Sequence, residues 1–321
     1  MSIARDRRRC DDRVVRRTRT VVLVWTMFAV VLAAIVVTYS RLPPHELYNV
    51  VGHGFVGGGL SRAVVYVNFP IGLAAMLLLL AVADRMSRGQ RYAAVAAFVL
   101  WAPVFSPRVL STAYLDARWA NAVPAAAVAL ALVLTVTTPA VRPAHVRGDA
   151  ARAAVALCLL AIALPWIAAE LGLDFVHVPV LGQIFQTHEL RLQPGMIVPH
   201  PAVHYGDHHG LEATLLVLTA LLTSRMLGAT RSPRLRRAFG FALALVIAYG
   251  LGNIANDFWI EQVAKRGWTT WLVPDVLQPK LSWAWLMIVA VAFVLWLALF
   301  RPRHPSRTTP DAASSAIRPS S

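Results

Sequence analysis

The side chains best suited to chemistry lie in one run of the chain, residues 200–212, which holds four histidines, one aspartate and one glutamate. Residues four positions apart share one face of a helix, so His204, His208 and Glu212 would align if a helix began early in this run. A proline and a glycine within the run argue against such an early start. The spacing therefore predicts a shared helix face only for His208 and Glu212.

Imidazole and carboxylate groups gathered in this way are typical of a metal site. Zinc takes neutral imidazole and carboxylate ligands, and three protein ligands with one open position are typical of a catalytic zinc site. Copper also accepts imidazole, so the sequence predicts zinc or another divalent transition metal. The predicted ligands are His200, His204, His208, His209 and Glu212. The predicted catalytic residues are Asp207 and Asp257, as general bases or as groups that orient the ligands.

Two other interpretations of the run remain open at this level. Four histidines in a turn that faces water can be solvated only, or they can form a proton relay or a pH-sensitive contact. Helix length favours a functional role, because twelve uncharged residues separate Glu212 from Arg225 and a span of about 20 residues would begin near His208. At that depth an ionisable group is costly unless it is paired or metal-bound.

The spacing from His204 to His209 resembles the histidine boxes of membrane desaturases and hydroxylases, which hold iron. The resemblance covers this short run alone, and those enzymes carry several such boxes on the cytoplasmic side. The run is also similar, more loosely, to the zinc site of membrane hydrolases of the ceramidase and progestin-receptor type. Those hydrolases place their histidines within the spans, beside a serine and an aspartate that have no clear counterpart here. Neither resemblance is extended to an activity.

The composition of the chain is that of a membrane protein. Hydrophobic residues make up 57% and charged residues 15%, with a mean hydropathy of +0.57, whereas roughly 25% charged residues is usual in soluble proteins. Segments that cross lipid must be helical, because lipid offers their backbone no partners. We therefore predict an all-α polytopic membrane protein with about eight transmembrane helices. The predicted spans are 21–40, 63–83, 92–110, 119–141, 153–169, 208–228, 238–256 and 281–300.

The loops between these spans differ sharply in charge. With a cytoplasmic N-terminus, one side carries 23 Lys and Arg against 6 Asp and Glu, and the other side carries 8 against 10. Eight of the ten histidines lie on the second side. This positive-inside pattern predicts a plasma-membrane protein with both termini in the cytoplasm. Anionic lipid headgroups at the inner face are the expected partners of the basic loops, and nucleic acid is not.

The segments outside the spans fall into two kinds. The basic leader, residues 1–20, and the tail, residues 301–321, are rich in arginine and polar residues, and we expect both to be disordered. The outer loop 170–207 is too apolar for disorder, so we expect it to form an ordered extracytoplasmic cap together with the Trp-rich loop 257–280. The acidic residues Glu170 and Asp257 close two spans at this side, where they either face water or approach His208.

Three functional hypotheses follow. The first is a metal-dependent enzyme, a hydrolase or transferase, that acts on a lipid or lipid-linked substrate at the outer leaflet. The second is a non-catalytic scaffold, assembly or metal-handling protein whose outer cap binds a partner. The third is an uncoupled transporter of a neutral solute, because the predicted spans carry charged residues only at their ends and a charge-coupled path is disfavoured.

Overall fold

The computed structural model describes residues 19–111, 114–139, 146, 148–185, 190–191 and 199–301, without the side chains of Arg19, Arg191 and His200. The predicted leader and tail therefore lie outside the described residues, except for residues 19, 20 and 301.

The regular elements of the described residues are helices, apart from a two-residue antiparallel pair formed by β1 (Leu190–Arg191) and β2 (His200–Pro201) and an isolated bridge between Leu47 and Tyr205. The α-helices are α2 (Arg19–Arg41), α3 (Ser61–Tyr66), α4 (Gly72–Val82), α5 (Arg88–Trp101), α6 (Ala122–Thr137), α7 (Asp149–Ile162), α8 (Leu164–Glu170), α9 (Leu181–Ile184), α10 (His209–Ser224), α11 (Pro233–Trp259) and α12 (Trp283–Leu295). Four segments are π-helical: η2 (Phe55–Leu60), η3 (Val67–Ile71), η8 (Ile260–Ala264) and η9 (Trp296–Phe300). The 3₁₀ segments are η1 (Pro44–Glu46), η4 (Ala83–Arg85), η5 (Ala102–Phe105), η6 (Trp119–Asn121) and η7 (Leu227–Ala229).

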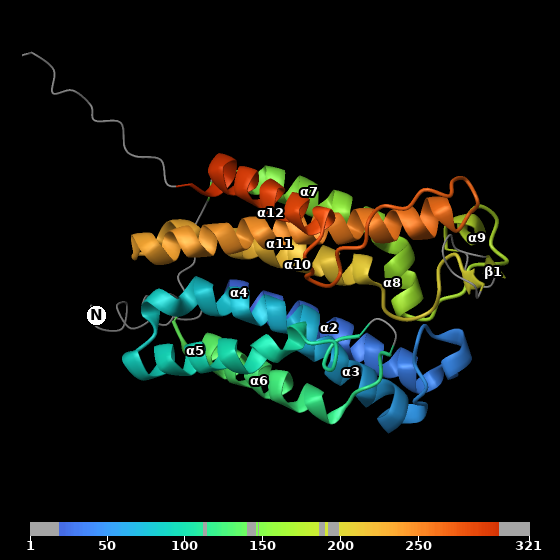
Figure 1. The fold of residues 1–321 in the computed structure, drawn as a ribbon, viewed down its shortest axis with the longest axis horizontal. Helices are drawn as coiled ribbons and strands as arrows, with labels where there is room; N and C mark the ends of the chain where they lie inside the picture. Colours follow the sequence, from blue (N-terminus) through green and yellow to red (C-terminus); the bar gives the residue numbers. More distant parts are fainter. Residues whose placement is uncertain are drawn as a thin grey trace, which may run out of the picture.

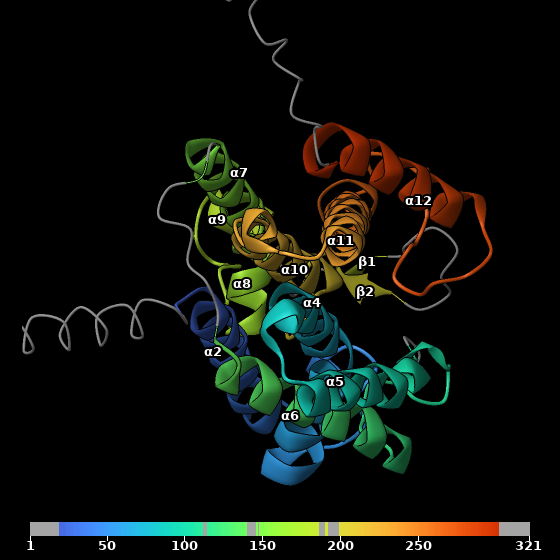
Figure 2. The same cartoon turned by 90° about the vertical axis from the view of Figure 1, so that its left-hand side faces the viewer.

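The two halves of the chain form two layers. Helices α2 to α6 lie in one layer, and α7, α10, α11 and α12 lie in the other (Figure 1). Figure 2, viewed along the helices, places α4 and α10 at the interface of the two layers, and α10 contacts both α2 and α4. The interior is therefore built between the halves, and any site there draws on both.

Six helices are long and apolar enough to cross a membrane: Thr20–Arg41, Phe55–Arg85, Trp119–Thr137, His209–Ala229, Pro233–Ala264 and Trp283–Phe300. A seventh span results if the pair α7 and α8, bent by 57°, is counted as one. The bend falls where Pro165 follows the end of α7, since proline cannot donate the helical hydrogen bond. The structure confirms an all-α fold among the described residues, with six helices, or seven if the bent pair counts as one span, that are long and apolar enough to cross a membrane. The prediction of eight spans is therefore met only in part.

The segment that falls short is the predicted span 92–110. Its helix α5 has 14 residues and ends at Trp101, just before Pro103 in the 3₁₀ segment η5. A span of the hydrocarbon core needs about 20 residues. Within the bundle α5 nevertheless packs beside α6. The beginning of α2 and the end of α12 lie at the same end of the molecule (Figure 1).

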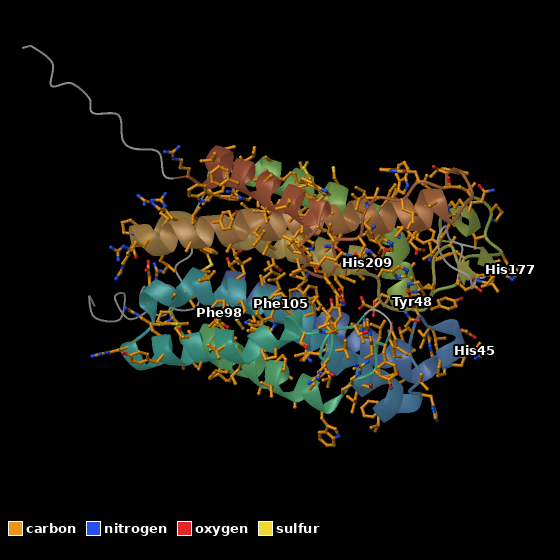
Figure 3. The ribbon with its side chains drawn as sticks, in the orientation of Figure 1. His45, Tyr48, Phe98, Phe105, His177 and His209 are labelled. Carbon is orange, nitrogen blue, oxygen red and sulfur yellow. The ribbon has the colours of Figure 1, made fainter. Side chains whose placement is uncertain are left out.

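Three labelled histidines and the Arg-rich turn between α10 and α11 lie toward opposite ends of the bundle. His45, His177 and His209 lie in the half that carries α8, α9 and β1 (Figure 3). The turn between α10 and α11 is held at the other end, where the carboxylate of Asp84 accepts hydrogen bonds from the backbone N–H of Arg231 and of Ser232. The Arg-rich turn 225–237 and these three histidines are thus separated along the long axis of the molecule.

In the loop 170–207, the described residues 170–185 fold into a compact turn. Phe175 and Phe185 bring their ring centroids within 4.9 Å, and the short helix α9 closes the segment. The apolar stretch beginning at Phe175 packs partly on itself. This segment lies beside α8 at the end of the bundle that carries the histidines (Figure 1).

Candidate metal centre

The segment that carries His204 and His208 is fixed by hydrogen bonds from its backbone to residues of α8 and α2. Gly206 donates its N–H to the carbonyl of Ala169 at 2.9 Å, and the Asp207 N–H donates to the Tyr39 hydroxyl at 3.0 Å. Gly206 has φ +87°, and a Cβ there would lie 2.5 Å from the Tyr39 hydroxyl. Only glycine fits this turn, so the turn sets the direction in which both histidines leave the backbone.

The two imidazoles lie against each other. The rings of His204 and His208 are stacked, with centroids 4.0 Å apart and planes within 12°. Nδ1 of His204 lies 2.9 Å from the carbonyl oxygen of Tyr205, and Nδ1 of His208 lies 3.0 Å from that of Gly206. A carbonyl oxygen only accepts, so each Nδ1 carries the proton, and the lone pair of each imidazole then lies on Nε2.

This arrangement of hydrogen bonds is the one found around metal-bound histidines, whose second ring nitrogen donates to a backbone carbonyl or a carboxylate. Nε2 of His208 is buried and has no hydrogen-bond partner among the described residues. Burial lowers the pKa of His208 well below its usual value, and the neighbouring His204 adds to this effect. His208 is therefore neutral, as a metal ligand must be.

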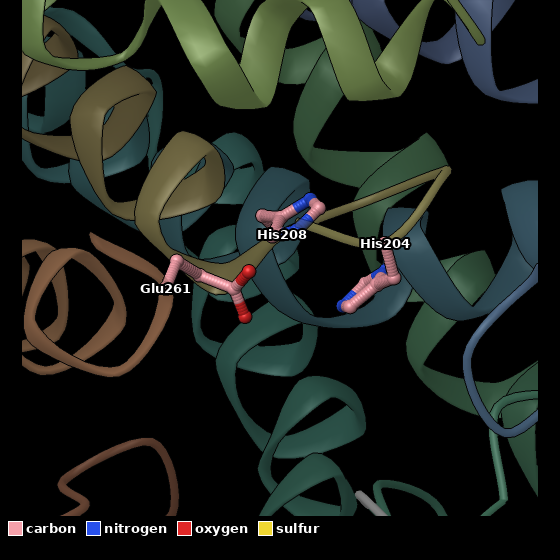
Figure 4. A group of neighbouring side chains, drawn as sticks. All are labelled: His204, His208 and Glu261. Atoms are coloured by element: carbon pink, nitrogen blue, oxygen red, sulfur yellow. The ribbon is translucent and has the colours of Figure 1, made fainter. Parts of the chain in front are cut away.

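The third ligand group comes from the far end of α11. Glu261 lies in the π-helical segment η8, and its ligand oxygen, with the ligand nitrogens of His204 and His208, forms a group within 4.8 Å (Figure 4). Its Oε1 accepts a hydrogen bond from Nζ of Lys265 at 2.8 Å. Its Oε2 is buried without a partner among the described residues. Two imidazoles and one carboxylate are a ligand set that zinc accepts in catalytic sites.

The three ligands face a cavity of about 280 Å³ between the two layers. An apolar wall comes from Val65, Phe69, Pro70, Leu110, Leu115, Ile260 and Leu277. The charged lining residues besides the ligands are Arg62, Asp207, Glu212, Asp257, Lys265 and Asp275. Tyr48 lies over the outer ring of the pair, stacked on His204 with centroids 5.1 Å apart. A metal ion held by the three ligands would thus be accessible to a small polar group bound in the cavity.

The predicted ligand Glu212 lies in the first turn of α10, at the cavity wall. Its Oε1 lies 3.8 Å from Nη2 of Arg62, and the same guanidinium forms a hydrogen-bonded ion pair with the Asp207 carboxylate. Asp207, predicted as a catalytic residue, is buried, and its Oδ1 has no partner among the described residues. The metal role of Glu212 and the catalytic role of Asp207 remain predictions.

The side chain of the predicted ligand His209, at the start of α10, contacts two residues of α11. Its Nε2 lies 2.9 Å from Oδ1 of Asn256, and its Nδ1 lies 3.5 Å from Oδ1 of Asp257. Asp257 also accepts the backbone N–H of Gly210 at 2.8 Å, and so satisfies one of the free donors at the start of α10. Both ring nitrogens of His209 are thus engaged. Its role as a ligand, and that of Asp257 as a base, remain predictions, and the side chain of His200 lies outside the described residues.

The sequence did not single out Glu261, Lys265 or Arg62. Helix α11 was predicted to end at Asn256, where charged residues begin, but the helix runs on through Trp259 and η8 to Ala264. Glu261 and Lys265 are four positions apart, a spacing that favours an ion pair on one helix face. This spacing could have indicated that the helix continues beyond Asn256. Glu170 is likewise buried beside Asp207 and Arg62 instead of facing water.

Comparisons of the chain with protein-family models, with curated proteins and with solved structures find no match. The function is therefore inferred from the geometry of the site.

Proposed function

We propose that this protein is a multi-pass plasma-membrane metalloenzyme, a hydrolase or transferase, with zinc or another divalent transition metal bound by His204, His208 and Glu261. The observation that carries the proposal is the convergence of three ligand atoms within 4.8 Å. Two of these groups, His208 Nε2 and Glu261 Oε2, are buried without a hydrogen-bond partner among the described residues. A buried polar atom in a native protein normally has a partner, so these two favour an ion.

The chemistry follows from the groups around the cavity. A bound metal ion supplies a Lewis acid that polarises a carbonyl or phosphoryl oxygen and lowers the pKa of a coordinated water. Lys265 orients the Glu261 carboxylate through Oε1 and leaves Oε2 for the ligand role. Asp207, whose Oδ1 is buried without a described partner, is the carboxylate best placed to accept a proton in the cavity. Asp257 holds the start of α10 and His209 in place.

A lipid or lipid-linked substrate is supported by a second hollow at the same end of the bundle. An apolar groove of about 1150 Å³ lies between the α7–α8 bend, the turn 176–185 and the end of α11. The wall at Phe258 belongs to a helix long and apolar enough to cross a membrane, and the wall at Ile162 belongs to the bent pair α7 and α8, which passes this test only when counted as one span. We assign an acyl chain of the substrate lipid to this groove. The charge of the loops supports a position of both hollows at the outer leaflet, with the basic loops on anionic headgroups at the inner face.

A non-catalytic scaffold or metal-handling protein is the second candidate, and one observation favours it. Trp268 and Trp271 in the loop before α12 expose 74% and 59% of their surface, and such aromatic side chains suit a docking surface. An enzyme should lose function when the histidines are replaced and keep it in Trp268→Ala and Trp271→Ala. A docking protein should show the opposite order of sensitivity.

An uncoupled transporter of a neutral solute is the third candidate. It depends on spans that carry charged residues only at their ends, and the buried residues Arg62, Glu212 and Glu261 lie in the outer parts of helices long and apolar enough to cross a membrane.

The metal content of the purified protein tests the proposal. Wild-type protein equilibrated with zinc and then desalted should retain about one metal ion per chain, and His208→Ala and Glu261→Gln should lose it. His45→Ala is the matched control, because His45 lies toward the same end and its side chain is 80% exposed. Metal that is absent from folded wild-type protein, or equal in all four proteins, would refute the proposal.

A further inference from the structure

We propose that Arg62 is the positioning residue of the metal centre: it holds the segment 204–208 from the opposite layer and so sets the geometry of the two histidine ligands. The inference rests on the proposed metal site. The geometry of the metal site then depends on both halves of the chain, because Arg62 lies on α3 while every proposed ligand lies between His204 and Glu261.

The contact itself is direct. Nη2 of Arg62 bonds Oδ2 of Asp207, the residue just before His208, and both side chains are more than nine-tenths buried. The guanidinium also lies 5.9 Å from the centre of the Tyr39 ring, and the Tyr39 hydroxyl accepts the Asp207 N–H. Asp207 is thus fixed at both its side chain and its backbone, and the direction of the His208 imidazole follows from it.

The approach of α3 to this segment depends on the glycines of residues 57–59. A Cβ on Gly58 would lie 2.1 Å from the carbonyl oxygen of Tyr39, and one on Gly59 would lie 2.6 Å from that of Val36. These glycines let η2 pack directly on the backbone of α2, one turn before Arg62. The glycine-rich run therefore brings Arg62 and Tyr39 together against Asp207.

The buried carboxylates around position 62 explain why an arginine occupies it. Glu170, Asp207 and Glu212 are all buried near one another, and Arg62 is the cation that acts on each of them. A planar guanidinium can address two carboxylates at once, as Arg62 does with Asp207 and, at 3.8 Å, Glu212. Lysine would keep the positive charge but offer a single point of contact.

Cobalt binding tests the assignment, because the visible absorption of Co²⁺ reports the geometry of its ligands as well as occupancy. The variants are Arg62→Lys and the paired change Arg62→Gln with Asp207→Asn, which removes both charges of the Arg62–Asp207 ion pair together. Arg118→Lys is the control, since Arg118 stacks on Tyr114 with its guanidinium carbon 4.6 Å from the ring centre and does not line the cavity. Gel filtration and circular dichroism in detergent establish that each variant is folded.

We expect both Arg62 variants to bind Co²⁺ about 10–100-fold more weakly than wild type, the range measured when a residue that orients a ligand is replaced. At saturating Co²⁺ their absorption bands should be shifted, whereas Arg118→Lys should match wild type in affinity and spectrum. Should Arg62→Lys fail to fold, the charge-neutral pair decides the matter alone. Wild-type affinity and spectrum in the folded Arg62 variants would overturn the inference and leave the proposed function standing. A wild-type protein that binds no Co²⁺ would overturn both.

Discussion

Glu261 and Lys265 form an ion pair at 2.8 Å, and their side chains are only 3% and 4% exposed. Breaking a buried pair by removing one partner typically costs about 3–5 kcal/mol, because the other charge stays buried and uncompensated. We therefore predict that Lys265→Met strongly destabilises the metal-free protein. Zinc bound at Glu261 would restore a positive charge beside the carboxylate, so added zinc should raise the melting temperature of Lys265→Met more than that of wild type.

Thermal unfolding in detergent, with and without zinc, measures this difference. Lys280→Met is the control, since Lys280 is exposed and lies outside the cavity. Its response to zinc should equal that of wild type. An equal zinc response in Lys265→Met and wild type would mean that Glu261 is not a ligand.

A second prediction concerns acid. The pKa of His208 in the folded protein is lowered by burial, whereas in the unfolded chain it lies near its usual value of about 6.5. Between these two values the unfolded chain binds a proton that the folded protein does not, so stability falls as the pH falls. Above about pH 6.5, His208 causes no loss of stability. Below that pH, the loss grows as the pH falls toward the pKa that His208 has in the folded protein.

Melting temperatures of the metal-free protein between about pH 8 and pH 5 check this. His208→Gln, which cannot be protonated, should lose less stability across the acidic part of that range than wild type loses. His45→Gln is the matched control, because its side chain is 80% exposed and it lies outside the cavity. If wild type and His208→Gln have the same slope, His208 is not the buried neutral group described above.

Sequence patterns predicted the class of fold and the region of the site, because both depend on properties that run along the chain. Long apolar stretches must be helices in lipid, and loops predicted on opposite sides, such as the turn 225–237 and the histidine-rich segment, lie at opposite ends of the bundle. The histidine-rich run did bring His204 and His208 together. The two histidines lie in one short segment, so their nearness follows from the sequence, whereas the stacking of their rings depends on the contacts of residues 206 and 207 with other helices.

The third candidate ligand, Glu261, could not be predicted from the spacing of residues along the chain. The sequence favoured Glu212, four positions after His208, on the assumption that both belong to α10. The helix begins at His209, and His208 has an extended backbone with ψ 137°, so its ring turns toward His204 and away from the helix face. The carboxylate near the two rings comes instead from Glu261, 53 positions further along the chain than His208. Only the packing of α10 on α11 places it there.

The sidedness of the metal centre gives a third prediction. Cys10→Ser and Cys158→Ser remove the cysteines of the sequence, and two single-cysteine proteins are then built on that background. His45→Cys reports the histidine-rich end, and Gly89→Cys reports the opposite end, where a side chain at Gly89 meets open space. A membrane-impermeant maleimide should label His45→Cys on intact cells and Gly89→Cys only after permeabilisation. The reverse pattern would place the metal centre at the cytoplasmic face and exclude a substrate from the outer leaflet.

A fourth prediction tests whether the apolar groove holds an acyl chain. Ala161 lines the groove, whereas Leu157, one turn earlier on the same helix, is 68% exposed and does not line it. Ala161→Trp should fill part of the groove, and Leu157→Trp should add an equal side chain to the outer surface of α7. The two variants differ in the groove but not in the chemistry of the added group.

The measurement uses protein in nanodiscs of phosphatidylcholine that carries a photoreactive group on one acyl chain. In wild type and in Leu157→Trp, irradiation should attach lipid preferentially to peptides that contain residues 176–185, because these form one wall of the groove. Ala161→Trp should lose most of this labelling while keeping the labelling of α12, whose exposed side chains, Met287 and Val294 among them, face outward over its length. Labelling spread evenly over all exposed apolar helices, with no change in Ala161→Trp, would show that the groove binds no chain. The substrate would then have to reach His204 and His208 through the smaller cavity alone, and a head group without a lipid tail would fit the site better.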